Sequence, residues 1–153
     1  MTKKSIVVVL GIIENEKGEI LLSLRDDPKF KGAHLKWDLV GGKNEMGESL
    51  EDTLKREAKE ESGLNVKVNK LLPHCICKNW KLPGYFQHTL VLCYGCRKIS
   101  GKLDCRDHKI RELKWAIPKE ALKLDLIFSA DIFLQLHRQT YSQTICHSVL
   151  LHL

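Results

Sequence analysis

The sequence lacks any apolar stretch of about 20 residues, the length that a membrane span requires. It also lacks internal repeats, low-complexity segments and linkers, so 153 residues with 43% hydrophobic content predict one domain with one core. The apolar run at residues 6–13 follows two lysines but has no small-residue cleavage site after it, and Glu14 and Glu16 come at once. A buried strand explains this run better than a signal peptide, and we expect a cytoplasmic protein without membrane contact.

No run of five or more basic residues is present, although the formal charge is +6. This balance favours anionic partners, first of all nucleotides, with nucleic acid as an alternative that we do not favour. Cys93 and Cys96 have the spacing of zinc ligands. Because Cys93 lies in a strand-like apolar run, and Cys75 and Cys77 alternate in another, we expect core residues on strands rather than metal ligands or disulfides.

Apolar patterning and turn residues predict an α/β chain. We expect strands at residues 5–13, 19–25, 37–40, 85–99 and 110–117, and mainly strand-like structure at residues 64–80. Helices are expected from Ser49, a good N-cap, to Ser62, with Gly63 ending the first one, then at 118–124 and 127–137. Residues 141–153 fit an extra strand, a packing helix or an oligomer contact.

The first predicted helix has an unusual face. At about 100° per residue, Glu57 and Glu61 project to the same side as Leu54 and Ala58, with Glu60 beside them. Isolated carboxylates are strongly disfavoured in a core, and three of them within one helical turn repel each other unless a cation intervenes. A hard divalent ion such as Mg²⁺ suits this all-oxygen set.

Gly41 and Gly42 precede this helix and would let the backbone approach a metal and offer it a carbonyl oxygen. Lys43 does not belong to a Walker motif, because Trp37 stands where that motif needs glycine. The alternative is that the helix is simply solvated and laced by pairs such as Glu51 with Lys55. Residue chemistry alone leaves the two interpretations about equally matched.

The spacing of Gly42, Glu48 and the segment 56–64, REAKEESGL, resembles the complete Nudix box, the signature of the Nudix hydrolase family. The resemblance implies an α/β/α sandwich with a mixed β-sheet, here a Nudix domain at residues 1–140 followed by a C-terminal extension at 141–153. It also implies cleavage of a nucleoside diphosphate linked to another group, with Mg²⁺ as the usual cofactor and Mn²⁺ as a substitute.

Carried over by position, the resemblance implies roles for the residues of the box. The Gly42 carbonyl and Glu57, Glu60 and Glu61 would bind the metal, while Glu48 would pair with Arg56 and fix the loop to the helix. The general base varies in this family. Glu60 and Glu61 are candidates, and Asp107, on a later loop, is the best match to the acid that some members use instead.

The segment 34–43 is similar to MutT-type members, which convert nucleoside triphosphates to monophosphate and pyrophosphate. We therefore expect that activity, with a nucleotide substrate and a monomeric or homodimeric protein. The alternatives are an ADP-ribose or nucleotide-sugar hydrolase, an RNA 5′-end pyrophosphohydrolase and a non-catalytic nucleotide sensor. The candidate substrate-binding residues, chosen for phosphate binding, base stacking or hydrogen bonding to a base edge, are Arg25, Trp37, Lys43, Phe86 and Asp131.

Overall fold

The computed structural model describes the backbone of residues 1–150 and the side chains of residues 1–140. No helix within this part of the chain is long and apolar enough to cross a membrane. The elements, in chain order, are β1 (Thr2–Glu14), β2 (Ile20–Arg25), β3 (Trp37–Lys43), α1 (Leu50–Ser62), β4 (Asn65–Leu71), β5 (Ile76–Leu82), β6 (Tyr85–Ser100), β7 (Ile110–Ala116), α2 (Pro118–Ala121) and α3 (Phe128–Leu150).

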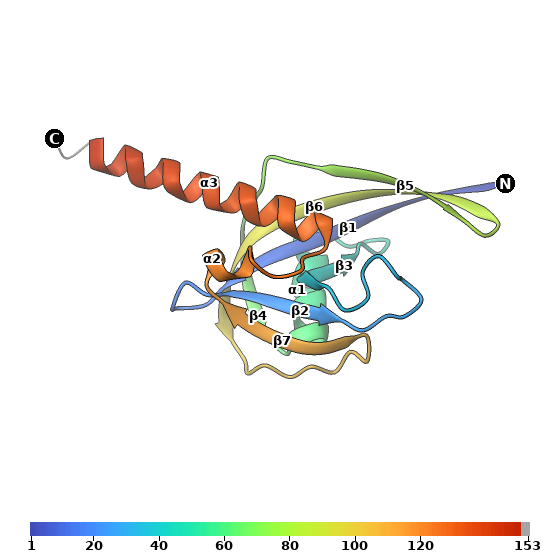
Figure 1. Ribbon diagram of the computed structural model, residues 1–153, viewed down its shortest axis with the longest axis horizontal. Helices are drawn as coiled ribbons and strands as arrows, with labels where there is room; N and C mark the ends of the chain where they lie inside the picture. Colours follow the sequence, from blue (N-terminus) through green and yellow to red (C-terminus); the bar gives the residue numbers. More distant parts are fainter. Residues whose placement is uncertain (151–153) are drawn as a thin grey trace.

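The strands form one mixed sheet in the order β4-β6-β1-β3-β2-β7, with β5 beside β6. β1 and β6 run parallel, and the other pairs are antiparallel. The first residues of β3 pair with β2, and its last ones pair with β1, where Val9 lies opposite Gly42. β3 therefore joins the two halves of the sheet (Figure 1).

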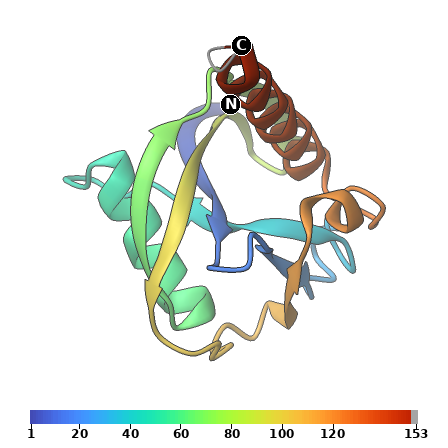
Figure 2. The same ribbon diagram turned by 90° about the vertical axis from the view of Figure 1, so that its left-hand side faces the viewer.

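Helices cover both faces of this sheet, as Figure 2 shows with α1 on one side and α3 on the other. Successive residues of β1 point to opposite faces. Leu10 and Ile12 belong to the cluster that includes Phe133 of α3, whereas Val9 and Ile13 pack with Leu54 of α1. The predicted α/β sandwich with a mixed sheet is confirmed.

The ends of α1 are also as predicted. The Ser49 hydroxyl accepts a hydrogen bond of 3.1 Å from the Asp52 backbone N–H, which satisfies one donor of the first turn. Gly63 ends the helix in the left-handed conformation with φ of 75°. The helix is thereby held to the length that places all three box glutamates on it.

Other boundaries differ from the predictions. The strand-like region at 64–80 is two strands, β4 and β5, separated at residues 72–75, where Pro73 cannot donate to a ladder. α2 ends at Ala121, and β5 continues to Leu82. The backbone of residues 141–150 extends α3, while 151–153 lie outside the described residues. Cys93 and Cys96 are buried as expected, but Cys75 and Cys77 are exposed, so the core role predicted for them is wrong.

Gly41 generates a prediction about stability. Its φ is 154°, and a Cβ built there would lie 2.1 Å from the backbone oxygen of Val9. Gly41→Ala should therefore lower the free energy of unfolding by at least about 2 kcal/mol, measured by chemical denaturation. Gly32→Ala, where an added Cβ meets no atom within 4 Å, is the matched control and should change it by less than about 0.5 kcal/mol. Equal losses of stability in the two variants would show that residue 41 does not specifically require glycine.

Candidate active site

The guanidinium of Arg56 lies at the centre of the carboxylates of α1. Its Nε donates to Glu48 Oε1 at 2.6 Å, and one terminal nitrogen donates to Glu57 Oε1 at 2.8 Å and to Glu60 Oε2 at 3.2 Å. The other terminal nitrogen donates to Glu48 Oε2 and to the backbone oxygen of Lys43. The structure thus joins the loop, the helix and the end of β3 through one side chain, which is the positioning role expected for Glu48 and Arg56.

The pKa values around Arg56 reflect this arrangement. Hydrogen bonds from Arg56 and from the Glu45 backbone hold the pKa of Glu48 at about 2, well below its usual range. Burial raises the pKa of Glu57, although the hydrogen bond and the charge of Arg56 oppose that rise. Glu48 is therefore a fixed anion, whereas Glu57 carries charge that Arg56 only partly offsets.

Gly42 lies directly against Glu57. A Cβ at residue 42 would come within 2.4 Å of the Glu57 carboxyl carbon. Only glycine leaves room here for the Glu57 carboxylate to lie directly against the backbone of β3. The predicted partnership of the Gly42 carbonyl with the box glutamates has the backbone approach that it requires.

Glu61 is the most buried carboxylate of the three, with a side chain only 6% exposed. The Gly41 backbone N–H donates to its Oε2 at 3.1 Å, and a terminal nitrogen of Arg25 lies 3.9 Å from its Oε1. Burial, with smaller contributions from the charges of Glu57 and Asp38, raises the pKa of Glu61 to about 8. This carboxyl group therefore changes charge near neutral pH.

Asp38 is a neighbour that the sequence interpretation missed. Burial raises its pKa to about 6, against the opposing charge of Arg25 and a 2.8 Å hydrogen bond from the Leu39 N–H. Asp38 lies two residues before Val40, which faces the α1 side of the sheet, so the two side chains point to the same side. The sequence did contain a signal for this residue, because an acidic residue at an inward-facing strand position is unusual and indicates a functional role.

Asp107 lies in the loop between β6 and β7, where it lines a hollow of about 640 Å³ together with Glu60. Its Oδ1 accepts a 2.8 Å hydrogen bond from the Lys109 backbone N–H. The side chains of Asp107 and Glu60 are 31% and 58% exposed. Both candidate bases thus reach one solvent-filled space at the end of α1.

Two residues predicted to bind substrate, Phe86 and Asp131, lie away from the carboxylates of α1. Phe86 pairs with Lys3 near the start of β1, six residues before Val9, the partner of Gly42. Asp131 lines a separate hollow on α3 with Gln135, whose side chain donates to it at 2.9 Å. Arg25 and Lys43, by contrast, reach the carboxylate group, since a terminal nitrogen of Arg25 lies near Glu61 and the Lys43 backbone oxygen accepts from Arg56. Trp37 starts β3, but its side chain packs on the α3 side of the sheet.

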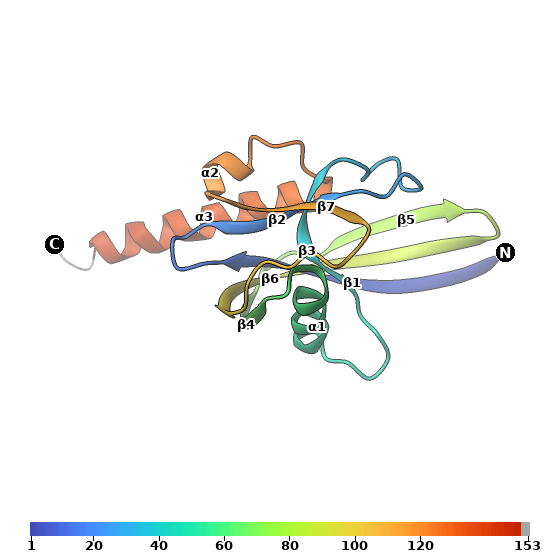
Figure 3. The same cartoon turned by 90° about the horizontal axis from the view of Figure 1, so that it is seen from below.

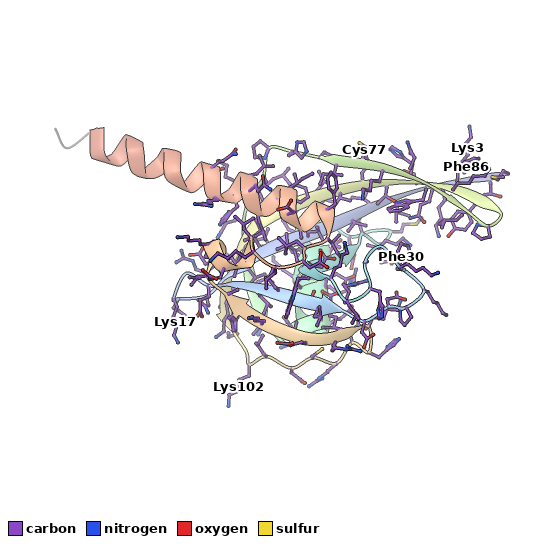
Figure 4. All side chains as sticks on the ribbon, in the orientation of Figure 1. Lys3, Lys17, Phe30, Cys77, Phe86 and Lys102 are labelled. Carbon is purple, nitrogen blue, oxygen red and sulfur yellow. The ribbon has the colours of Figure 1, made fainter. Side chains whose placement is uncertain are left out.

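Three aromatic side chains, Phe30, Trp80 and Phe128, form a group near Trp37 that the sequence analysis did not predict. The Phe30 and Trp80 rings meet edge to face at 6.3 Å, and the Lys78 ammonium lies 5.2 Å from the Trp80 ring centre and 4.9 Å from that of Phe128. The Ile127 N–H, next to Phe128, donates to the Trp37 oxygen at 2.8 Å. These side chains come from the 26–36 loop, β5 and α3 (Figure 4 labels Phe30).

The carboxylate and carbonyl oxygens of this site are the type of ligand that a hard divalent cation prefers. Among the described residues, no three His, Cys, Asp or Glu side chains are already gathered closely enough to hold a metal ion. Arg56 instead draws Glu57 and Glu60 to itself, and Gly41 holds Glu61. Burial raises the pKa values of Glu57 and Glu61, so additional positive charge beside these two carboxylates would favour their ionised forms.

Glu61 makes stability depend on pH in the absence of metal. Since its folded pKa is raised to about 8 from 4.5, the folded chain binds more protons than the unfolded chain between these values, and stability falls as pH rises. In EDTA, the free energy of unfolding should decrease from about pH 6.5 to 8. Glu61→Gln should show a clearly flatter dependence, and the same slope in both proteins would exclude Glu61 as the titrating group.

Comparisons with known proteins identify the family of this chain. The family model described as the NUDIX domain matches residues 4–136. The nucleoside triphosphatase NudI of Escherichia fergusonii is 26% identical over 126 residues, which cover 78% of this chain and 86% of NudI. The ADP-ribose pyrophosphatase of Methanocaldococcus jannaschii is 44% identical over 66 residues, covering 43% of this chain and 37% of that protein.

The crystal structure of a MutT protein from Methanosarcina mazei Go1 has the same fold, with a TM-score of 0.66 and 26% identity over 92% of this chain and 98% of that one. The family match spans residues 4–136, a range that contains α1 and the glycines of β3. This chain therefore belongs to the NUDIX domain family and is a Nudix hydrolase.

Proposed function

We propose that this hydrolase is a Mg²⁺-dependent pyrophosphohydrolase that converts a free nucleoside triphosphate, with ribose or deoxyribose, to the monophosphate and pyrophosphate. The observation that carries the proposal is the placement of three glutamates on one helix: Glu57 lies against Gly42, Glu61 lies near Arg25, and Glu60 shares Arg56 with Glu57. The likeness to NudI, named a nucleoside triphosphatase, supports the same class of substrate.

The metal would be held by the Gly42 carbonyl and by Glu57, Glu60 and Glu61. When bound, it would neutralise phosphate charge and help to activate water. The chain itself prepares the place for it. Arg56 keeps Glu57 and Glu60 close together, and burial of Glu61 excludes water from one side of the site.

Arg25 is suited to hold the phosphates. Its Nε is buried and has no hydrogen-bond partner among the described residues, although its terminal nitrogen lies near Glu61. A buried guanidinium N–H without an acceptor is costly, and a phosphate oxygen is a strong acceptor for it. We infer that a phosphate of the substrate takes this place.

In the reaction, the oxygen of a water molecule forms a bond to phosphorus and the bond to the departing pyrophosphate breaks. The water proton must pass to a base, for which Glu60, Glu61 and Asp107 are the candidates. Burial raises the pKa of Glu61 to about 8, so without metal this group is mostly protonated at pH 7 and must lose its proton before it can act as a base. Glu60 and Asp107 line one hollow, and either could take up the proton.

The base of the nucleotide would lie toward the aromatic group of Phe30, Trp80 and Phe128. Trp37 lies on the α3 side of the sheet near this group, and its partner on β2, Leu24, precedes Arg25. Exposed aromatic rings near a cation provide stacking surface for a planar base. Stacking on these rings does not distinguish one base from another, so the group supports binding of a nucleotide but does not identify its base.

A second candidate is hydrolysis of ADP-ribose. It is favoured by the 44% identity to the Methanocaldococcus jannaschii enzyme, which is higher than the 26% to NudI but covers only 66 residues. A nucleotide-sensing module without catalysis is not favoured, because every box glutamate is present.

The metal assignment predicts the behaviour of two variants. Glu60→Gln and Glu61→Gln should each lower kcat by at least about 10²-fold, because each removes a metal ligand or the base, while the far-UV circular dichroism stays unchanged. Glu16→Gln, in the exposed turn after β1, is the matched control and should keep full activity. Undiminished turnover in both site variants would contradict the assignment.

A substrate panel tests the reaction itself. Nucleoside triphosphates, oxidised nucleotides, ADP-ribose and dinucleoside polyphosphates are incubated with Mg²⁺ or Mn²⁺, and the products are resolved by ion-exchange chromatography. We expect triphosphates to be the best substrates, with monophosphate and pyrophosphate as products. Faster turnover of ADP-ribose, or release of single phosphate from triphosphates, would replace the proposed reaction.

A further inference from the structure

Acidic residues are absent from a large part of this chain. Residues 1–13 and 64–103 contain nine of the 25 lysine and arginine residues and none of the 19 acidic ones. In the folded protein these segments are neighbours, because they form β1, β4, β5 and β6. The rest of the chain, which holds the metal-binding carboxylates, has more acidic than basic residues. The positive charge is therefore concentrated on one part of the sheet.

The first half of β1, β5 and the first half of β6 form a three-stranded ribbon that extends away from the helices, as Figures 1 and 3 show at the end marked N. β6 is the middle strand, since Lys3 and Lys81 both pair with Phe86, and Ser5 and Asn79 both pair with His88. Paired residues point to the same side of a sheet. We call this side the ribbon face, defined by Lys3, Ser5, Asn79, Lys81, Phe86 and His88.

The ribbon face is open to solvent. All six of its residues are exposed, and the Phe86 side chain is 43% exposed despite its size. Figure 4 shows Lys3 and Phe86 together at the free end of the ribbon. His88 and Asn79 are joined by a 2.7 Å contact between Nδ1 and Oδ1, which orders the second row. An aromatic ring between two lysines, followed by a polar pair, is thus held on a rigid sheet.

We propose that the ribbon face binds a single-stranded nucleic acid whose 5′ phosphate end lies at the α1 carboxylates. Strands are about 4.8 Å apart, so the two lysines flank the Phe86 ring at roughly 5 Å on each side. A ring on a sheet stacks with a base, and the cations beside it meet the phosphates. The face carries no carboxylate that would repel a polyanion.

Lys3, Ser5 and Val7 point to the same side of β1 as Val9, whose partner Gly42 faces Glu57. α1 covers this side from Val7 onward, since Val7 is half-buried and Val9 is fully buried in the cluster with Leu54, so a bound chain would reach the carboxylates along the edge of α1. Six residues of strand separate Lys3 from Val9, a distance of about 20 Å. A single nucleotide held at Gly42 does not extend that far, whereas a chain of several nucleotides does. The ribbon would therefore act on oligonucleotides and leave free nucleotides unaffected.

Binding is tested first, without turnover. A short single-stranded oligoribonucleotide with a 5′ hydroxyl and a 3′ fluorophore is titrated in EDTA over a series of salt concentrations, and its anisotropy is measured. The Lys3→Ala/Lys81→Ala variant should reduce the slope of log affinity against log salt by about 1.4, because each phosphate contact contributes about 0.7 for single strands. Phe86→Ala should weaken binding about 5- to 150-fold with the slope unchanged.

The matched control is Lys17→Ala/Lys119→Ala, which removes the same charge from the turn after β1 and from α2. It should leave the salt slope close to that of the parent protein. Phe86→Tyr keeps an aromatic ring and should retain affinity, and thermal melting of every variant shows whether the fold is intact. Equal losses in both lysine pairs, or binding to vesicles with anionic lipids but not to the oligonucleotide, would overturn the proposal.

Turnover then tests where the 5′ end lies, a part that rests on the proposed function. Hydrolysis of a 5′-triphosphorylated oligoribonucleotide is compared with that of a free nucleoside triphosphate. Lys3→Ala/Lys81→Ala should lower kcat/KM for the oligonucleotide and leave it unchanged for the free nucleotide. Equal effects on both substrates would overturn the placement of the 5′ end. If the parent protein hydrolyses neither substrate, the proposed function and this placement fail together, while the binding result still decides the ribbon.

Discussion

Carboxylates can face the interior of a protein only if positive charge or N–H donors meet them, and the whole active-site side of this molecule follows from that constraint. Arg56 meets the buried side of Glu57, and the Gly41 backbone N–H meets Glu61. The same guanidinium also holds the more exposed Glu48 and Glu60. Because Arg56 also donates to the Lys43 oxygen, α1 and β3 are joined by the same contacts that neutralise the carboxylates. Structure and chemistry depend here on one set of hydrogen bonds.

Local signals explain what could be predicted from the sequence. The Ser49 cap, Gly63 and the spacing of Leu54 and Ala58 act within one or two helical turns, so α1 and its glutamate face followed from them. Asp38 and the group of Phe30, Trp80 and Phe128 were not predicted as neighbours, because strand pairing and loop position bring them together over long distances in the chain. Phe86 was expected near the base because the sequence does not reveal the strand register. The pairing of β6 with β1 and β5 places it on the ribbon instead.

The site also separates two tasks between different parts of the fold. The proposed metal ligands lie on one helix and one strand end, and their carboxylates are held by hydrogen bonds of 2.8 to 3.2 Å. The aromatic side chains near Trp37 come from three segments and meet through ring contacts that tolerate different shapes. The chemistry is thus built rigidly, whereas substrate choice is left to side chains that can vary independently.

The connection between β6 and β7 is tied down on both sides of the segment that contains Asp107. The Asp104 N–H donates to the Ser62 oxygen at the end of α1, and the Asp26 N–H donates to the Lys109 oxygen. Residues 105–108 can therefore lengthen, shorten or change sequence in evolution without moving the helix end or the core. A substitution in this segment would add, remove or relocate an acid beside the three glutamates while the proposed metal-binding side chains stay in place.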